Sequence, residues 1–230
     1  MNIIKPVYMA IGISLAVAAC SDTDSTDDPT LSVNEQGYSE INPEPLQQDL
    51  QEIPAGELSE EEISGLLYMR EEEKLAHDVY RYLFDVWNQN VFDNIADSEQ
   101  THTDAVKALL VRYALTDPAE GKDAGQFENP ELQQLYDSLV AEGEASLIDA
   151  LMVGAAIEEI DIIDIAEAME NIEDNDDIVL VYDNLMKGSR NHLRALVKNL
   201  SNNGITYEPR YLSQEEYDSI VNSDIEKGSQ

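Results

Sequence analysis

From Leu58 onwards, apolar residues recur every three or four positions, with polar residues between them. This period is typical of amphipathic α-helices that turn one face to a core. The sequence has no alternation with a period of two, the pattern of half-exposed strands. The pattern therefore predicts an all-α fold: an antiparallel four-helix bundle with short extra helices. The long helices are expected at residues 60–87, 92–114, 146–172 and 176–202.

Short boundary motifs support these limits. Residues 59–62 (SEEE) form a capping box, in which a serine and a glutamate side chain cap each other's backbone N–H groups. The same pattern at residues 213–216 (SQEE) predicts a short C-terminal helix. Asn129-Pro130 predicts the start of another, because asparagine is a good N-cap and proline is favoured at the first helical position.

The first 20 residues, MNIIKPVYMAIGISLAVAAC, contain one lysine and an apolar run that is too short to span a bilayer. They predict a signal peptide at residues 1–19. Val17–Cys20 resembles a lipobox, the cleavage signal of bacterial lipoproteins, which implies lipid modification of Cys20. The alternative is an ordinary cleaved signal. By the same resemblance, Ser21 implies a place in the bacterial cell envelope at the outer membrane, facing the periplasm or the surface.

The segment that follows is acidic and interrupted by prolines. Its apolar residues are too few to offset the entropy of ordering, so we expect a disordered tether at residues 20–57. The folded domain is expected at residues 58–222, with a C-terminal tail at residues 223–230.

The charge balance excludes one class of partner. The chain has 13 Lys+Arg against 48 Asp+Glu, a formal net charge of −35. Nucleic acid is not an expected partner, because binding it requires a basic surface. Metal ions are expected partners, and so is the membrane through the lipid anchor. The oligomeric state is open, with a homodimer among the alternatives. Cys20 is the only cysteine, so the chain can form no internal disulfide.

The helix predicted at residues 92–114 carries two metal-ligand residue types on its apolar face. Glu99 and His102 share a stripe with Ile95 and Val106, at spacings of three and four residues. A charge on a core-facing stripe is costly unless something compensates it, and a metal ion would do so. The alternatives are a solvated pair at the helix margin or a buried Glu–His pair satisfied by hydrogen bonds.

The helix predicted at residues 60–87 offers two adjacent candidates. Glu73 interrupts one apolar stripe and Glu72 interrupts the neighbouring one, so periodicity does not choose between them. The alternative for both is a charged segment that favours the helix dipole.

The other two long helices also carry candidates. Glu158 and Asp161 share a face within GAAIEEIDIIDI, and Glu159 lies on the adjoining face. If that face is buried, these carboxylates require a cation, whereas the alternative is exposure to solvent. His192 interrupts an apolar stripe, where a hydrogen-bonded core histidine is the alternative.

Together, all four long helices place oxygen or nitrogen ligands near mid-helix on the core face. Di-iron carboxylate bundles use a Glu from each of two helices and Glu-x-x-His from each of the other two. Carboxylate and imidazole ligands suit iron and other divalent metals. The sequence therefore predicts a metal site in the bundle core, with two iron ions as the first expectation and another divalent metal as the alternative.

Several segments, in this order along the chain, resemble the DUF2202 family (domain of unknown function 2202). They are LSEEEISGLLYMREEEKLAHDVYRYLFDVW, FDNIADSEQTHTDAVKALL, NPELQQLYDSLVAEG, GAAIEEIDIIDI, GSRNHLRALV and PRYLSQEEYDSI. The resemblance covers residues 58–220 and implies a ferritin-like fold.

EKLAHDVY also resembles the first-helix motif of rubrerythrins, which implies that Glu73 is the metal-binding glutamate of the first helix. By the same analogy, Glu99 and His102 form the Glu-x-x-His motif of the second helix. Glu158 matches the glutamate of the third helix and His192 the histidine of the fourth.

One position departs from the ferritin-like pattern. Ser189 stands three residues before His192, where the pattern has a glutamate. Asp161 or water would have to replace the missing carboxylate. The departure leaves open a single-metal site, a site for a metal other than iron, or a degenerate site.

The resemblance implies a lipid-anchored, ferritin-like protein that oxidises Fe(II) or reduces peroxide at its iron centre. The alternative is a non-catalytic binding or interaction module of the envelope, and the sequence leaves open whether the protein is an enzyme. Tyr80 and Tyr113 fall on the ligand stripes, where they either pack or support the centre with a hydrogen bond.

Overall fold

The computed structural model describes residues 29–228. The predicted signal peptide and Cys20 lie outside this part of the chain. Within residues 29–228, no helix combines the length and the apolar character needed to cross a membrane.

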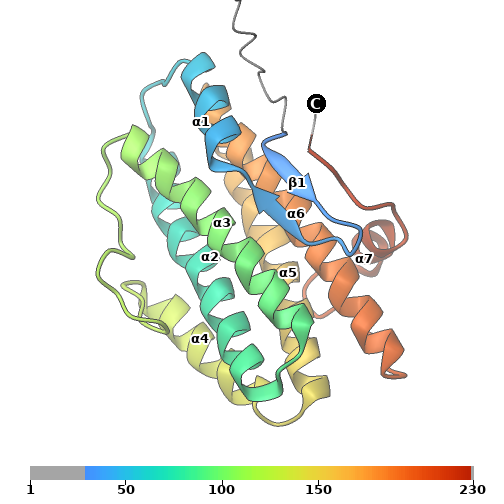
Figure 1. The fold of residues 1–230 in the computed structure, drawn as a ribbon. Coiled ribbons are helices and arrows are strands. Elements are labelled where there is room, and N and C mark those ends of the chain that lie inside the picture. Colours follow the sequence, from blue (N-terminus) through green and yellow to red (C-terminus); the bar gives the residue numbers. More distant parts are fainter. Residues whose placement is uncertain (1–28, 229–230) are drawn as a thin grey trace, which may run out of the picture.

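Four long helices form the bundle, which confirms the prediction of an all-α fold (Figure 1). They are α2 (Glu60–Trp87), α3 (Asn90–Arg112), α5 (Leu147–Glu170) and α6 (Asp176–Asn202). Helix α2 packs along α3 and α5 along α6, and the two pairs meet through contacts of α2 with α5 and of α3 with α6. Neighbouring helices run in opposite directions (Figure 1).

One connection is long. After α3 the chain returns along the side of the bundle through residues 113–129 and α4 (Pro130–Gly143), so that α5 begins at the opposite end from the one where α3 stops (Figure 1). The side chain of Asn129 accepts the N–H of Glu131 at 2.8 Å and thereby caps α4. This crossover lets α3 and α5 run in the same direction without being direct neighbours.

The capping motifs act as the sequence predicted. Ser59 at the start of α2 accepts the backbone N–H of Glu62, whose side chain accepts the N–H of Ser59 in return. The same reciprocal pair begins α7 (Gln214–Val221), with Ser213 as the N-cap. Each cap satisfies two backbone donors that a helix start leaves free.

The prediction of a disordered tether is wrong for residues 29–57. This stretch forms a two-stranded antiparallel hairpin of β1 (Leu31–Val33) and β2 (Ser39–Ile41), followed by α1 (Pro43–Glu52). Four of its apolar side chains are nearly inaccessible to solvent: Leu31, Ile41, Leu46 and Leu50. The average composition of the segment did not predict this packing. Four well-placed apolar residues are enough to order the segment when the bundle offers them an apolar surface.

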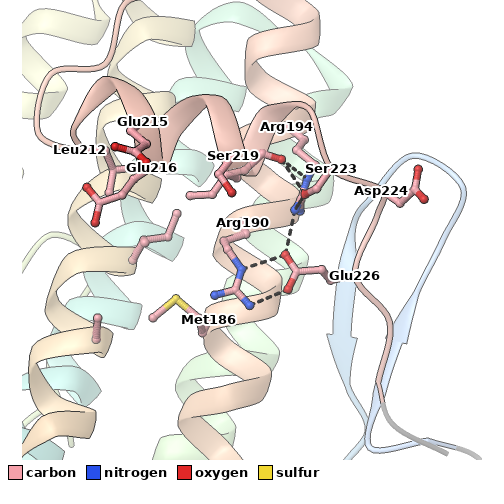
Figure 2. A pocket seen from close by; sticks show the side chains of 13 residues that line it. Met186, Arg190, Arg194, Leu212, Glu215, Glu216, Ser219, Ser223, Asp224 and Glu226 are labelled. Carbon is pink, nitrogen blue, oxygen red and sulfur yellow. Dashed lines mark hydrogen bonds and ion pairs between the residues drawn. The ribbon is translucent and has the colours of Figure 1, made fainter.

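The C-terminal tail is also fastened to the bundle. Arg190 and Arg194 of α6 both donate to Oε1 of Glu226 at 2.8 Å, and Asn191 donates to its backbone carbonyl, also at 2.8 Å. Figure 2 shows the contacts of Arg190 and Arg194 with Glu226 at the edge of a pocket between α5, α6 and α7. Packed structure therefore extends beyond the expected domain, residues 58–222, at both ends.

We expect Leu46→Ala to lower the free energy of unfolding by about 2 kcal/mol or more, because truncating a buried leucine loses transfer free energy and leaves a cavity. Val111→Ala on α3 is the control. Its side chain is 72% exposed, so its effect should stay within about 0.5 kcal/mol. Urea denaturation measures both variants. A Leu46→Ala protein as stable as the parent would restore the tether interpretation.

Candidate metal centre

Five ionisable side chains from the four long helices meet in the middle of the bundle. They are Glu73 of α2, Glu99 and His102 of α3, Glu158 of α5 and His192 of α6, and each is 0% exposed. They form two groups of three, within each of which the potential ligand atoms lie within 4.8 Å of one another: Glu73, Glu99 and His102, and Glu99, Glu158 and His192. Glu99 belongs to both groups.

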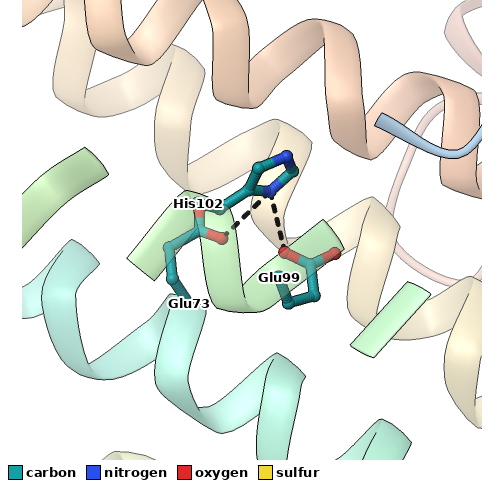
Figure 3. A group of neighbouring side chains, drawn as sticks. All are labelled: Glu73, Glu99 and His102. Atoms are coloured by element: carbon teal, nitrogen blue, oxygen red, sulfur yellow. Dashed lines mark hydrogen bonds and ion pairs between the residues drawn. The ribbon is translucent and has the colours of Figure 1, made fainter. Parts of the chain in front are cut away.

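The Glu99 carboxylate lies between the two imidazoles. Its Oε2 is 2.8 Å from Nδ1 of His102 and its Oε1 is 2.8 Å from Nδ1 of His192. The outer glutamates lie farther away: Glu73 is 3.4 Å from Nδ1 of His102, and Glu158 is 3.4 Å from Nδ1 of His192. Figure 3 shows the first group, with Glu73 and Glu99 both directed at His102. The two groups thus have matching compositions and share one carboxylate.

Local helix geometry explains this meeting point. Glu99 and His102 are three residues apart, so both project from the same face of α3. Ile95 and Val106 lie on that face above and below them and are completely buried. The structure therefore places the Glu-x-x-His motif inside the core, not at a solvated margin.

Several polar atoms of the centre lack hydrogen-bond partners among the described residues. They are both carboxylate oxygens of Glu73, Oε1 of Glu99, Oε2 of Glu158 and Nδ1 of His192. Glu99 and His192 approach closely, but in a direction that makes no hydrogen bond. A buried polar atom without a partner costs about 1–3 kcal/mol, and more when it is charged. Two divalent cations, one for each group, would satisfy these atoms, so the residues present fit a two-ion centre.

Burial and mutual charge shift every pKa in the centre. Burial raises the pKa of Glu73 to about 8 and also raises that of Glu158. Burial alone would raise the pKa of Glu99, but the charges of His102 and His192 lower it below its ordinary value. Burial by itself would lower the pKa values of His102 and His192. Glu99 and Glu73 nevertheless raise the pKa of His102 to about 10, and Glu158 and Glu99 raise that of His192 to about 9.

Without a bound metal ion, these pKa shifts favour protonation of His102, His192 and Glu73 at neutral pH. At neutral pH both imidazoles are charged and balance the carboxylates around them. A metal ion needs the neutral imidazole as a ligand, so metal binding must displace these protons.

A serine that sequence reasoning missed holds both imidazoles from the other side. Oγ of Ser39, on β2, lies 3.2 Å from Nε2 of His102 and 3.0 Å from Nε2 of His192. The serine is 2% exposed. The strand that carries it is anchored to α3, because the N–H of Ile41 donates to Oγ1 of Thr101 at 3.0 Å. The N-terminal hairpin is therefore part of the centre.

The close approach of these groups requires a glycine on α6. A Cβ at residue 188 would lie 2.6 Å from Nε2 of His102 and 2.9 Å from Oγ of Ser39. Glycine inside a helix costs up to about 1 kcal/mol relative to alanine, so Gly188 indicates a steric requirement. That glycine, four residues before His192, is the one signal in the sequence that could have revealed the crowding.

Tyr80 supports one outer ligand. Its hydroxyl donates to Oε1 of Glu158 and lies 3.0 Å from the carbonyl oxygen of Gly154. Burial and the charge of Glu158 raise the pKa of Tyr80 well above its ordinary value, so the phenol keeps its proton. Tyr113 has no such role, because its hydroxyl lies 2.8 Å from the carboxylate of Asp177 instead.

The remaining candidates belong to neither ligand group, for different reasons. Glu159 is occupied by the hydroxyl of Tyr207 at 2.6 Å and by three backbone N–H groups of residues 210–212. Asp161 is 2% exposed but belongs to neither ligand group. The hydroxyl of Ser189 donates to the carbonyl of Leu185 at 3.1 Å, within its own helix.

The fold and the buried side chains define a class of protein: an all-α bundle with a carboxylate–histidine cluster in its core. A family described as "Uncharacterized protein domain (DUF2202)" matches residues 62–224. The chain belongs to this DUF2202 family, as the resemblance of its motifs indicated.

Similar proteins agree with this assignment. The uncharacterized protein MJ0754 of Methanocaldococcus jannaschii is 53% identical over 176 residues, which cover 76% of this chain and 95% of that protein. The crystal structure of the hypothetical protein MJ0754 from Methanococcus jannaschii DSM 2661 superposes with a TM-score of 0.74 at 51% identity, covering 76% of this chain and 99% of that one.

The pKa shifts predict how the stability of the metal-free protein depends on pH. The folded-state pKa values of His102 and His192 lie above their ordinary value of 6.5. Their stabilising contribution is therefore complete below about pH 6.5 and is lost as the pH rises through about 9 to 10. The raised pKa of Glu73 acts in the same direction, with its loss occurring between its ordinary 4.5 and about 8.

We therefore expect the melting temperature of chelator-treated protein to fall steadily as the pH rises from about 7 to about 10. Thermal denaturation followed by circular dichroism measures this. His77→Ala is the control and should keep the same slope, because His77 lies outside both ligand groups and contacts Asp78 at 3.0 Å. A melting temperature that stays level or rises over this range would contradict the charge distribution described above.

Proposed function

We propose that this protein is a ferritin-like metalloprotein that holds two divalent metal ions, with iron as the first candidate. The proposed activity is oxidation of Fe(II) or reduction of peroxide. One observation carries the proposal: the buried Glu99 carboxylate is shared by two matching ligand groups, and several polar atoms in these groups lack hydrogen-bond partners. A single cation would leave one group uncompensated, so this arrangement favours two.

The donor set and the chain path support the ferritin-like class. Helices α2 and α5 each contribute one glutamate, and α3 contributes Glu-x-x-His, as in di-iron carboxylate bundles. The single long crossover between α3 and α5 is the connection that ferritin-like bundles use. Carboxylate and imidazole donors without a thiolate favour iron or manganese over soft metals.

Iron bound by these residues would supply one-electron chemistry between Fe(II) and Fe(III). The protein's own groups prepare the site for it. With both imidazoles neutral and protonated at Nε2, the two lone pairs of the Ser39 hydroxyl can accept both N–H groups. That tautomer turns the Nδ1 lone pairs of His102 and His192 toward the carboxylates. Tyr80 keeps Glu158 in place and retains its own proton.

The setting proposed for this chemistry is the cell envelope. The lipid anchor at Cys20 and the outer-membrane location stay predictions from the sequence, because they rest on residues outside the described part of the chain. Electrons for peroxide reduction would have to come from another molecule, because one cysteine cannot build a Cys-x-x-Cys site.

The proposal predicts two iron ions per chain, one for each ligand group. After anaerobic loading with Fe(II) and desalting, elemental analysis should find this content in the parent protein and in the control His77→Ala. Glu99→Gln should lose most of both ions, because the substitution replaces the one carboxylate that both groups share with a neutral amide. His102→Ala tests the same centre through a ligand of one group.

The other outcomes identify the alternatives. One ion per chain would indicate a single-metal site. No tightly held metal after refolding in its presence would indicate a non-catalytic envelope module with a degenerate centre, an alternative favoured by the orientation of Ser189. Equal weak binding by Glu99→Gln and His77→Ala would assign the ions to the acidic surface.

A second prediction concerns the serine behind the histidines. Ser39→Ala should weaken divalent-metal affinity by about tenfold or more, because removing a group that orients metal-binding histidines typically has this effect. Ser32→Ala on the neighbouring strand is the matched control, since its hydroxyl contacts Asn42 and not a histidine. Competition with a zinc-sensitive fluorescent chelator measures both affinities, and nitrogen-15 spectra of the imidazoles report the tautomers. Equal affinities and unchanged tautomers in Ser39→Ala would overturn the role assigned to the serine.

A further inference from the structure

The metal centre is closed to solvent, and the N-terminal hairpin covers it on one side. Strand β2 packs against both α3 and α6, the helices that carry the two histidines. A polar pocket of about 590 Å³ lies between the hairpin and α3, and Ser39 is among the residues that line it. Ser39 also contacts both imidazoles. One side chain of the hairpin therefore separates the centre from an open pocket.

The hairpin is the part of this cover that can move at the lowest cost. A two-stranded hairpin is only marginally stable by itself, whereas the long helices of a bundle open only together with most of the core. Strand β2 is tied to α3 by the N–H of Ile41, which donates to Oγ1 of Thr101 at 3.0 Å. A movement that gives metal ions access to the buried ligands is therefore expected in the hairpin and not in the helices.

The C-terminal tail, residues 223–228, covers the free edge of the hairpin. The N–H of Asn42 donates to the carbonyl of Thr30, so the N–H and carbonyl of Leu31 point away from β2. A Cβ at Gly228 would lie 2.5 Å from the carbonyl oxygen and 3.2 Å from the nitrogen of Leu31. The tail backbone thus lies against the edge of β1 that β2 leaves unpaired (Figure 1).

The tail is held to α6 next to the histidine of that helix. Nδ2 of Asn191 donates to the carbonyl of Glu226 at 2.8 Å, and Oδ1 of Asn191 accepts the N–H of Glu226 at 3.0 Å. Arg190 and Arg194 hold the Glu226 carboxylate. The hairpin turn reaches the same point, because a Cβ at Gly37 would lie 3.5 Å from the carbonyl oxygen of Asn191. Tail, hairpin and histidine-bearing helix therefore meet around one residue.

We propose that the hairpin, residues 31–41, is a lid over the metal centre and that the C-terminal tail is the latch that keeps it closed. The latch sets how fast metal ions enter and leave, because the buried ligands become accessible when the hairpin moves. The inference deepens the proposed function and rests on the proposed two-ion centre. The competing explanation is that the tail stabilises the whole domain and that metal exchanges through global unfolding.

Amide hydrogen exchange followed by NMR tests the latch without any metal. In metal-free full-length protein, Glu226→Gln removes the charge that Arg190 and Arg194 hold. The N–H of Ile41 should then exchange on the order of tenfold faster, the scale on which hydrogen bonds to charged groups stabilise a segment. Amides in the middle of α2 should exchange at the parental rate. Glu215→Gln is the matched control, because its exposed carboxylate lines the same pocket as Glu226 and forms no ion pair with either arginine.

Cobalt release then tests whether the lid is the route. Full-length protein loaded with Co²⁺ is mixed with excess EDTA, and the loss of visible absorption gives the release rate. Glu226→Gln should release cobalt on the order of tenfold faster than the parent, in line with its exchange at Ile41, and Glu215→Gln at the parental rate. Release should depend only weakly on urea, because opening a hairpin exposes little surface, whereas global unfolding exposes the whole core.

The outcomes separate the lid from its alternatives. Faster exchange at Ile41 with parental exchange in α2, together with faster cobalt release, supports the lid and its latch. Equal acceleration at Ile41 and in α2, or release with the urea dependence of global unfolding, overturns the proposal in favour of general stabilisation. Unchanged exchange at Ile41 overturns the latch, and faster exchange with parental release overturns the route.

The proposed function can fail separately. If the parent protein develops no cobalt absorption, the two-ion centre falls and the route with it, whatever the exchange at Ile41. Should Glu226→Gln fail to fold, Gly228→Ala takes its place, because the added Cβ would meet the carbonyl oxygen of Leu31 and displace the tail.

Discussion

The contact on which the rest of the structure depends is that of one carboxylate with two imidazoles. Glu99 lies 2.8 Å from Nδ1 of both His102 and His192, with no solvent access to any of the three. Bringing them together requires α3 and α6 to pack closely at this level. Charged groups in a dry core stay stable only when they are paired, so the helices around this contact must supply compensating charge. Glu73 and Glu158 approach the two imidazoles from α2 and α5, so all four long helices contribute to the centre.

The same contact explains features of the periphery that otherwise look arbitrary. The N-terminal hairpin packs onto the bundle through Leu31 and Ile41, yet its polar residue Ser39 also turns inward. There its hydroxyl meets the Nε2 atoms that the Glu99 side of the rings leaves free. Gly188 gives up helix propensity so that a side chain does not fill this space. Packing of the hairpin and orientation of the histidines are therefore coupled, and a change that detaches the hairpin should disturb the centre.

Much of the fold was predictable because its signals are local. Capping boxes and the 3.6-residue period placed the four long helices to within about two residues, and the period also put Glu99 and His102 on the core face. Periodicity alone could not choose between Glu72 and Glu73, whereas the resemblance to the rubrerythrin motif pointed to Glu73, which the structure places in a ligand group. Both are buried, and adjacent residues on a helix enclosed on most sides face different neighbours that the sequence does not identify. The role of Ser39 could not be predicted for a further reason: its partners lie 63 and 153 residues away along the chain.

The serine at position 189 has a consequence for charge. With two divalent ions in the proposed centre, four positive charges would face the three carboxylates of the ligand groups. One uncompensated positive charge in a low-dielectric core is costly, so binding of the two ions should favour ionisation of a further carboxylate nearby. Asp161 is the candidate, because it is 2% exposed and close enough to interact with Glu73 and Glu158. On this reasoning, Asp161 on α5 supplies the negative charge that α6 lacks because it carries Ser189.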